Sequence, residues 1–560
     1  MLARGPPRGA TAVTDHSTAR PTSPFAPERR APAGALLLAL LVPLACVYYL
    51  GVQRAVTGAL GGLPLDDSWI HLVFARSLAA GEGLAFNPGE LVPASTAPLW
   101  TALLALVHLL PFDPVLPVKL LGVALATLAV LESARLARAL GLPRPLAVLA
   151  AAAVAMTDWL AWAALSGMEI PLFTLLSLAG MRLHAEESAG RRAGRLSLLL
   201  LALAVLARPE GLLLLLLAVV ERAAGSDRRG LARLRGMGVD LALVAVLLVP
   251  MALFNFAVSG SPLPTTFAAK AGGVRHLLPD LHTLYLAFGL LFRSHPVLAL
   301  LAGGGALELA ARRLAGHRVA LLPALWLFAL PVALSLLGGA GGAVLGNFGR
   351  YLFPLFPVLA VVGCAALARP LAAVAATAGD GPRRVRWAAV LVVPLVLGPG
   401  LFVLVRGGGR YAQSVANVET SDVRLARWLT PRLAPEALLA VADVGAMKYL
   451  LPNRLIDLGA LVTPELHAEL RREGDLPPEE ALARFLARRG VDFVAVYPRF
   501  LPAFERDPAR FAPLVRLAIP DNITMAGDEL VLYRTGWCAH PLREPPEPAA
   551  APDPTRRSTP

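Results

Sequence analysis

The chain has 560 residues, of which 56% are hydrophobic and 16% are charged, and its mean hydropathy is +0.61. This composition excludes an ordinary soluble globular protein and is typical of a polytopic membrane protein. The net charge of +13 does not indicate nucleic-acid binding, because the arginines gather in short clusters between apolar runs, as cytoplasmic loops do under the positive-inside rule.

The N-terminal part predicts a tail, a first helix and a long outer loop. Residues 1–33 are rich in Pro, Arg, Thr and Ala and are expected to form a disordered cytoplasmic tail. The run 34–52 reads as an uncleaved helix that crosses from inside to outside. The loop 53–114 then lies outside. Its apolar piece 98–110 is too short to span, because a crossing takes about 20 residues, so it is expected to lie in the membrane plane or to re-enter.

The later apolar runs alternate across the membrane when the arginine clusters are placed inside. Together with the first helix they predict about eleven spans, with the N-terminus inside and the C-terminus outside. The later spans are expected at 115–137, 146–163, 168–183, 195–207, 211–221, 239–257, 282–311, 319–338, 350–368 and 387–405. The sequence FRSHP interrupts the run 282–311. The fold class is therefore a polytopic α-helical membrane protein, with a transmembrane domain over 34–408.

The chain changes character after about residue 410. Its apolar runs shorten to strand length at 437–445, 491–498 and 529–534, and charge-rich amphipathic stretches separate them. This pattern predicts a small extracytoplasmic α/β domain over 409–540. Residues 541–560 are rich in Pro, Glu and Arg and are expected to be a disordered tail.

Charged side chains interrupt the apolar runs at the predicted outer face, where buried charge is costly and marks function. These residues are Asp66, Asp67, His71, Glu169, Arg208, Glu210, Lys270 and Arg350. Each also has a purely structural alternative. Asp66 or Asp67 could cap the helix that follows them, and Glu169 could cap another helix. Arg208 and Glu210 could form a local ion pair, whereas Lys270 and Arg350 could be interfacial cations with extended side chains.

Taken together, these residues suit one chemistry. A carboxylate can act as general base on a hydroxyl group, and cations can hold a phosphate leaving group. A helical bundle also admits a lipid tail from the side. The combination predicts glycosyl transfer from a polyprenyl-phosphate sugar to a glycan or glycolipid acceptor. Two other classes remain open: a transporter or flippase of lipid-linked saccharides, and a non-catalytic envelope scaffold.

Several segments resemble a known family in the same order along the chain. The stretch LDDSWIHLVFARSLAAGEGLAFNPGE with STAPLW resembles the first outer loop of bacterial GT-C glycosyltransferases, especially those related to the mycobacterial terminal arabinofuranosyltransferases. Further similar segments are SGMEIPLF (166–173), ARPEGLLL (207–214), PLPTTFAAK (262–270), RYLFPLFP (350–357) and VADVGAMKYLLPNRLIDLGALVTPE (441–465). The resemblance covers about residues 64–465.

The resemblance implies a GT-C-like bundle in the bacterial inner membrane, with its active site on the periplasmic face. It implies Asp66 as the catalytic base, with Asp67 as its partner and Glu169 as a second acidic site. His71, Arg208, Glu210, Lys270 and Arg350 are then expected to bind substrate. No metal ligands are assigned, although the paired carboxylates could hold Mg²⁺ or Mn²⁺.

Overall fold

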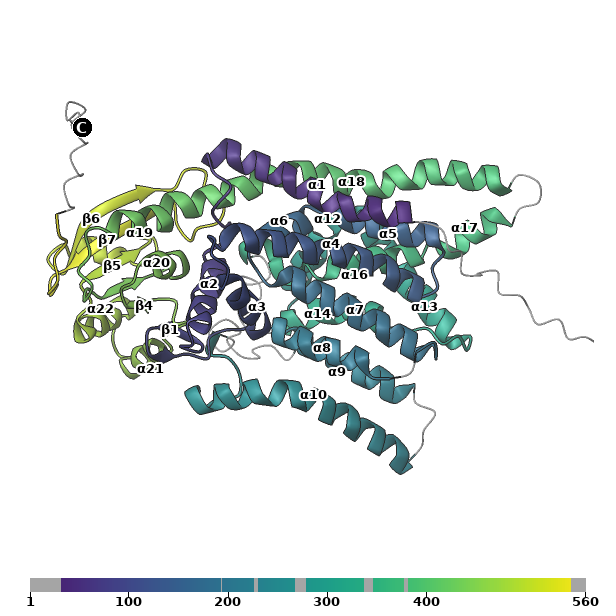
Figure 1. The fold of residues 1–560 in the computed structure, drawn as a ribbon, viewed down its shortest axis with the longest axis horizontal. Helices are drawn as coiled ribbons and strands as arrows, with labels where there is room; N and C mark the ends of the chain where they lie inside the picture. Colours follow the sequence, from purple (N-terminus) through teal and green to yellow (C-terminus); the bar gives the residue numbers. More distant parts are fainter. Residues whose placement is uncertain are drawn as a thin grey trace, which may run out of the picture.

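The computed structural model describes residues 32–192, 194–225, 230–266, 278–336, 346–376 and 381–544. A helical bundle forms one end of the molecule and an α/β domain forms the other (Figure 1). Two helices of the first loop, α2 (Asp66–Ala79) and α3 (Pro98–His108), lie between them, together with the hairpin β1 (Ala85–Asn87) and β2 (Glu90–Leu91).

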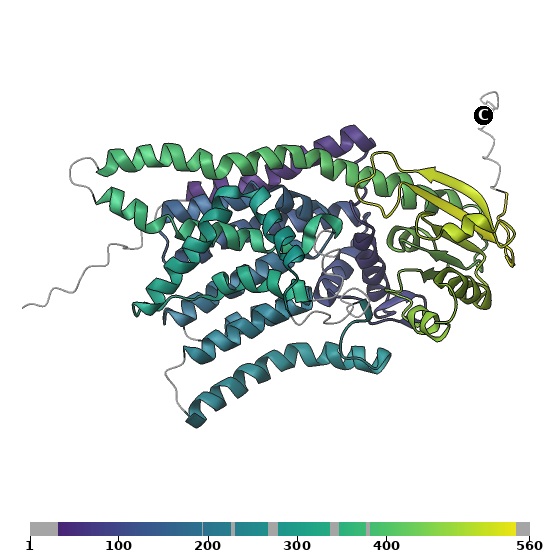
Figure 2. The ribbon, with the colours of Figure 1, turned by 180° about the vertical axis from the view of Figure 1, so that it is seen from behind.

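Most of the described helices belong to the bundle. They are α1 (Pro32–Thr57), α4 (Val115–Ala139), α5 (Arg144–Ala155), α6 (Asp158–Leu165), α7 (Ile170–Ser188), α8 (Leu196–Ala207), α9 (Gly211–Ala224), α10 (Gly230–Ser259), α12 (Leu281–Ser294), α13 (Pro296–Leu314), α14 (Leu322–Leu336), the 3₁₀ helix η1 (Gly346–Leu352), α16 (Leu355–Ala365), α17 (Ala368–Ala375) and α18 (Gly381–Val418). The view from behind shows α7, α8 and α9 as neighbouring, roughly parallel rods, with α10 at the margin (Figure 2).

Glycines allow the closest helix contacts in this bundle. A Cβ atom on Gly122 of α4 would lie 2.1 Å from the carbonyl oxygen of Ala164 in α6. A Cβ atom on Gly305 of α13 would lie 1.8 Å from the carbonyl oxygen of Val362 in α16. Helices in a membrane gain little from the hydrophobic effect and rely on close backbone approach, so these two glycines set the contacts of α4 and α13.

Five helical segments of the described chain are long and apolar enough to cross a membrane, and two bent pairs would raise the number to seven. The expected count of about eleven spans also includes shorter helices such as α8 and α14, and it stays a prediction. The interruption at FRSHP is visible as a 114° bend between α12 and α13. His295 leaves the helical conformation there and Pro296 begins the next helix, so 281–314 is not one straight span.

The C-terminal region contains the described five-stranded sheet, in the order β4-β3-β5-β7-β6. Its elements are the π-helical turn η2 (Glu419–Val423), α19 (Arg424–Leu429), β3 (Leu439–Val441), α20 (Gly445–Leu450), β4 (Leu455–Asp457), α21 (Glu465–Arg472), α22 (Pro478–Arg489), β5 (Phe493–Val496), α23 (Pro502–Arg506), β6 (Phe511–Ala518) and β7 (Glu529–Thr535). Strands β4, β3 and β5 are parallel, whereas β7 and β6 are antiparallel to their neighbours. The three apolar runs singled out in the sequence contain β3, β5 and β7.

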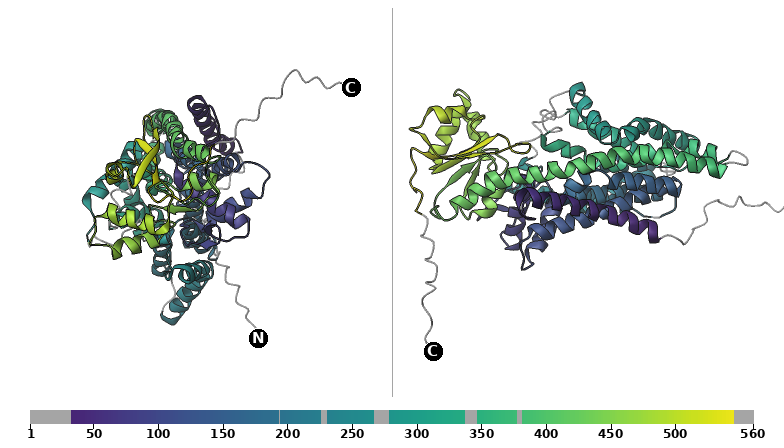
Figure 3. Two further views of the ribbon diagram at one scale, coloured as in Figure 1. Left: turned by 90° about the vertical axis from the view of Figure 1, so that its left-hand side faces the viewer. Right: turned by 90° about the horizontal axis from the view of Figure 1, so that it is seen from above.

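The long helix α18 connects the bundle to this sheet. It has 38 residues, which gives it a length of about 57 Å, and it packs along α1. From above, it runs from the far end of the bundle to the α/β domain (Figure 3). The helix continues through residues 408 and 409, where the sequence suggested a domain boundary.

Candidate functional site

A cavity of about 460 Å³ lies where the bundle meets the first loop. Its wall comes from α2, the turn before α7, the turn between α8 and α9, α14 and η1. It also includes residues 94–96 of the first loop, residues 263–266 and residues 461–462 of the α/β domain. Segments separated by almost 400 residues therefore share one site, at the end of the bundle that faces the sheet (Figure 1).

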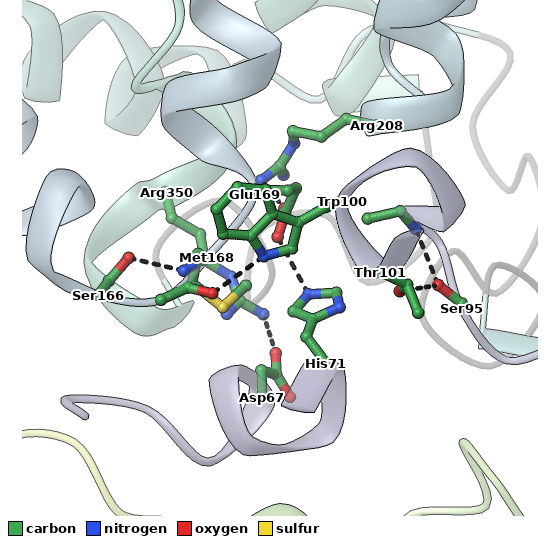
Figure 4. A network of polar contacts seen from close by, with 12 residues as sticks. Asp67, His71, Ser95, Trp100, Thr101, Ser166, Met168, Glu169, Arg208 and Arg350 are labelled. Carbon is green, nitrogen blue, oxygen red and sulfur yellow. Dashed lines mark hydrogen bonds and ion pairs between the residues drawn. The ribbon is translucent and has the colours of Figure 1, made fainter. Parts of the chain in front are cut away.

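Glu169 is the centre of a charged network in this wall. One carboxylate oxygen lies 3.1 Å from Nε2 of His71, and the other accepts a hydrogen bond of 2.6 Å from Arg208. Arg208 also donates to Glu210 at 2.9 Å. His71, Glu169 and Arg208 are each less than a tenth exposed. This buried charge is tolerated because each ion has a hydrogen-bonded partner of opposite sign or a histidine ring beside it (Figure 4).

Asp67 and Arg350 form a second ion pair in the same cavity. The guanidinium groups of Arg208 and Arg350 both lie near the ring of Tyr351, at 5.1 and 5.7 Å from its centroid. Arg350 is only 4% exposed, and one of its terminal nitrogens has no hydrogen-bond partner among the described residues. Because guanidinium nitrogens only donate, this group is suited to an anionic oxygen that enters the cavity.

Asp66 faces a different partner from its neighbour. Its two carboxylate oxygens accept hydrogen bonds from the backbone nitrogens of Gly445 and Ala446, each at 2.7 Å. These nitrogens belong to the start of α20, and Asp66 is not among the residues that line the cavity. Adjacent aspartates on α2 therefore do different things: Asp66 holds the α/β domain, and Asp67 lies in the cavity wall.

Burial and neighbouring carboxylates perturb the titration of this contact. Burial raises the pKa of Asp66 well above its ordinary value, and Asp443 raises it further, although the two backbone N–H groups act in the opposite direction. Burial likewise raises the pKa of Asp443 to about 6, against the hydrogen bond that Tyr497 donates to it. The contact between α2 and α20 therefore contains carboxyl groups whose pKa values are raised, so they take up protons at a higher pH than ordinary aspartates do.

The remaining wall of the cavity is apolar. It consists of leucines and neighbouring small side chains on α9, on α14 and in the segment after α10, namely Leu212, Leu213, Leu216, Leu263, Pro264, Leu330, Ala333 and Leu334. Some of these side chains continue to the outside of the bundle, where Leu212 and Leu216 are 44% and 52% exposed. The cavity thus has a charged end at Glu169 and an apolar wall formed by α9 and α14.

Six of the residues expected from the sequence meet in this cavity: Asp67, His71, Glu169, Arg208, Glu210 and Arg350. Lys270 lies outside the described residues. The structural alternatives are partly realised, because Arg208 and Glu210 do form a local pair. Neither aspartate occupies the cap position of α2, which is Leu65, and Glu169 precedes α7 without a side-chain capping bond. Arg350 is buried and therefore does not extend to the interface.

The first loop also binds the α/β domain through residues that sequence reasoning did not single out. The side-chain amide of Asn87 donates to the carbonyl of Leu455 and its oxygen accepts from the nitrogen of Leu455, both at 3.0 Å. Asn87 therefore pairs with edge strand β4 as a neighbouring strand would. Arg76 donates to the carbonyl of Tyr449 at 2.8 Å. The Asn-Pro-Gly turn after β1, in which Gly89 has a φ of +76°, was the sequence feature that could have indicated the hairpin carrying Asn87.

Tryptophans near the site are part of the protein interior. Trp69, Trp100, Trp159 and Trp162 are all buried. Trp100 donates from its indole nitrogen to the carbonyl of Gly167 at 3.0 Å. This bond ties α3 to the turn that carries Glu169 (Figure 4).

A cage made by the protein alone holds a divalent cation through several side-chain ligands, whereas Mg²⁺ often binds to one or two carboxylates together with a substrate phosphate. Within the described ranges, no group of three or more acidic, histidine or cysteine side chains has an arrangement that could hold a metal ion. The carboxylates nearest the cavity are engaged by Arg350, by Arg208 and His71, and by backbone N–H groups. The binding of Mg²⁺ or Mn²⁺ by the paired carboxylates stays a prediction of the sequence.

Comparisons with known proteins agree on the fold. ArnT from Cupriavidus metallidurans in the apo state aligns with a TM-score of 0.56 and 15% identity over 90% of this chain and 98% of that one. The same protein bound to undecaprenyl phosphate aligns with a TM-score of 0.55, at 15% identity and the same coverage of both chains. The oligosaccharyltransferase of Archaeoglobus fulgidus, tethered with an acceptor peptide, gives 0.54 at 13% identity over 83% of this chain and 69% of that one. The chain shares the GT-C fold of these membrane glycosyltransferases.

Sequence comparison adds one family and no curated relative. Residues 411–540 match a domain of unknown function, DUF8728. No curated protein matches the chain. The matched segment begins inside α18 and includes the whole described sheet. The family is thus defined by the α/β domain, and the cavity is built mostly from the part of the chain that precedes it.

Proposed function

We propose that the chain is an integral-membrane glycosyltransferase that moves a sugar from a polyprenyl-phosphate donor to a cell-envelope glycan or glycolipid. The observation that carries the proposal is the two-sided cavity, in which buried arginines face an apolar wall formed by α9 and α14. A lipid phosphate has the same two parts. The undecaprenyl phosphate in the similar ArnT structure supports this class of donor.

The charged end supports specific roles for side chains. The donor phosphate binds to Arg350 and Arg208, whose guanidinium groups neutralise it. This phosphate competes with Asp67 for Arg350, and the Asp67 carboxylate in the cavity wall acts as general base. The resemblance in sequence favoured Asp66 for this role, but Asp67 is the aspartate that lines the cavity. Glu169 orients His71 and Arg208, and Glu210 holds Arg208 from the other side.

The transfer then follows from these positions. Asp67 takes the proton from an acceptor hydroxyl, and that oxygen forms a bond to the anomeric carbon of the sugar. The bond between the anomeric carbon and the phosphate oxygen breaks, through a state with oxocarbenium character. The electron pair leaves with the lipid phosphate, and Arg350 and Arg208 stabilise the resulting charge.

The arginine clusters support an extracytoplasmic position for the cavity. Glu169 lies at one end of α7, which has 19 residues and is therefore about 28 Å long. Arg191 and Arg195 follow the other end of α7. Arg312 lies at this end of the bundle as well, where it donates to the carbonyl of Leu140. Under the positive-inside rule the arginine end is cytoplasmic. We therefore infer a multi-pass protein of the bacterial inner membrane, with the N-terminus inside and with the cavity and the α/β domain outside. The arabinofuranosyl class of donor remains the prediction of the sequence resemblance.

The test uses the purified protein in nanodiscs with a panel of polyprenyl-phosphate pentoses and hexoses, in the presence of membrane extract as acceptor. The wild type should release lipid phosphate with at least one donor. Asp67→Asn should lower this rate by about 10²- to 10⁴-fold, which is the usual contribution of a general base. Glu82→Gln, an exposed change in the same loop, is the matched control. Equal rates in Asp67→Asn and wild type would remove Asp67 from the chemistry. Movement of the donor across the bilayer without release of lipid phosphate would favour a flippase.

A further inference from the structure

A second cavity lies on the other side of the wall that closes the charged one. Its volume is about 600 Å³, and we call it the hairpin groove. It is lined by the hairpin β1–β2, the last turn of α10, β4 and the segment around the start of α21, with Arg489 at the end of α22. This volume is within the range of about 300–1,000 Å³ that is typical of binding sites for small molecules.

The wall between the two cavities is a single layer of backbone. The nitrogen of Thr265 donates to the carbonyl of Pro93 at 2.9 Å, and the hydroxyl of Thr266 donates to the carbonyl of Ala94 at 3.0 Å. Along both segments, neighbouring residues face opposite sides: Pro93 and Thr265 line the hairpin groove, whereas Ala94 and Thr266 line the charged cavity. Val462 lines both cavities, so the two spaces meet at this residue.

The hairpin groove differs chemically from the charged cavity. Its ionic side chains form two pairs of opposite sign, Glu90 with Arg454 and Glu465 with Arg489. All four side chains are between 43% and 59% exposed, so they meet solvent at the mouth of the groove. Their charges sum to zero. A groove with balanced, water-facing carboxylates and guanidinium groups offers many hydrogen bonds and no net attraction for an anion.

We propose that the hairpin groove binds the body of the acceptor, a neutral polyhydroxylated chain, while its terminal hydroxyl enters the charged cavity near Val462. The proposal rests on the proposed glycosyltransferase function. The apolar wall formed by α9 and α14 suits the lipid donor, so a polar acceptor needs a separate approach from water. Sugar hydroxyls both donate and accept hydrogen bonds, which matches the paired carboxylates and guanidinium groups. Aliphatic side chains such as Leu91 and Ile456 can cover the apolar faces of sugar rings.

Binding measurements can test this separately from turnover. Short linear neutral oligosaccharides of pentose and of hexose units are titrated into the protein in nanodiscs, and saturation-transfer NMR reports binding. Ser259→Trp fills the groove from the end of α10 and should weaken binding at least tenfold. Ala257→Trp is the matched control, because Ala257 lies on the same turn, is exposed and does not line the groove. Arg489→Gln, which adds no bulk, should weaken binding several-fold.

Binding of undecaprenyl phosphate is measured in parallel and should not change in any of these variants. Equal oligosaccharide affinity in wild type and Ser259→Trp would overturn the proposal, as would the absence of binding by every neutral oligosaccharide. Tighter binding of uronic-acid oligosaccharides of the same length would overturn the assignment of a neutral ligand. Failure of the proposed function would give a different result. The wild type would then release no lipid phosphate, whether or not the hairpin groove binds sugars.

Discussion

Gly445 offers a direct test of whether the α/β domain positions the charged cavity. A Cβ atom added at Gly445 would lie 2.2 Å from the carbonyl oxygen of Asp66 and 2.9 Å from the backbone nitrogen of Ile70. Both of these are backbone atoms of α2, so no flexible side chain can move aside. The substitution Gly445→Ala must therefore separate α20 from α2 by about 1 Å before the new methyl group reaches ordinary contact distance.

The size of the effect follows from what α2 carries. A shift of α2 by about 1 Å would displace His71 from its 3.1 Å contact with Glu169 and would disturb the pair of Asp67 with Arg350. A displacement of this size can lower a catalytic rate by about 10²-fold. The cost in folding stability should be smaller, about 1–3 kcal/mol, as is usual for overpacking.

The assay is release of lipid phosphate, with thermal unfolding of the same preparation as the measure of stability. Gly61→Ala is the matched control, because Gly61 precedes α2 and a Cβ atom there meets nothing within 4 Å. We expect Gly61→Ala to behave as wild type and Gly445→Ala to lose about two orders of magnitude in rate while it remains folded. A folded Gly445→Ala variant with normal turnover would refute the idea that α20 sets the position of α2.

Three further predictions concern the same region. Arg208→Ala leaves the buried Glu169 without its cation and should lower the free energy of unfolding by about 3–5 kcal/mol. The double variant with Arg208→Gln and Glu169→Gln should be more stable than Arg208→Ala, as measured by thermal unfolding. Asn87→Ala removes both hydrogen bonds to Leu455, and hydrogen exchange at that amide should become faster without a change at β7. Burial raises the pKa of Asp443 to about 6, so the folded protein binds a proton that the unfolded chain has lost and its stability falls as pH rises from about 4 to 6. Asp443→Asn should therefore raise the melting temperature at pH 7.5 and have little effect near pH 4, and a lower melting temperature at pH 7.5 would contradict this sign.

The sequence indicated which end of the helices carries the site, because charge that interrupts an apolar run can be placed once the arginine clusters are assigned to one side. That placement predicted that Asp67, Glu169 and Arg350 lie at the same end of the bundle, where they line one cavity. The sequence did not predict that Asp66 and Asp67 face different partners. Neighbouring positions on a helix differ by about 100° in direction, and the rotation of α2 is set by its contacts with α3 and α20.

The pairing of Asn87 with β4 was hidden for a related reason. The hydrogen bond between Asn87 and Leu455 joins residues 368 positions apart, and nothing in the local pattern of either segment specifies its partner. Periodicity predicts that a strand exists, but it does not identify which edge remains open or what covers it. The bend at Pro296 was visible in advance because its cause, a proline in an apolar run, is local.

These contacts make α2 the mechanical link between the two parts of the molecule. On one side Asp66 binds the start of α20, and Arg76 binds carbonyls at its end. On the other side Asp67 and His71 complete the charged cavity. A helix of 14 residues that is held at both ends transmits a displacement rather than absorbing it. Binding of a ligand between the hairpin and the α/β domain would therefore act on the same helix that carries the proposed base. We therefore expect acceptor binding to change the geometry of the proposed reacting groups through α2.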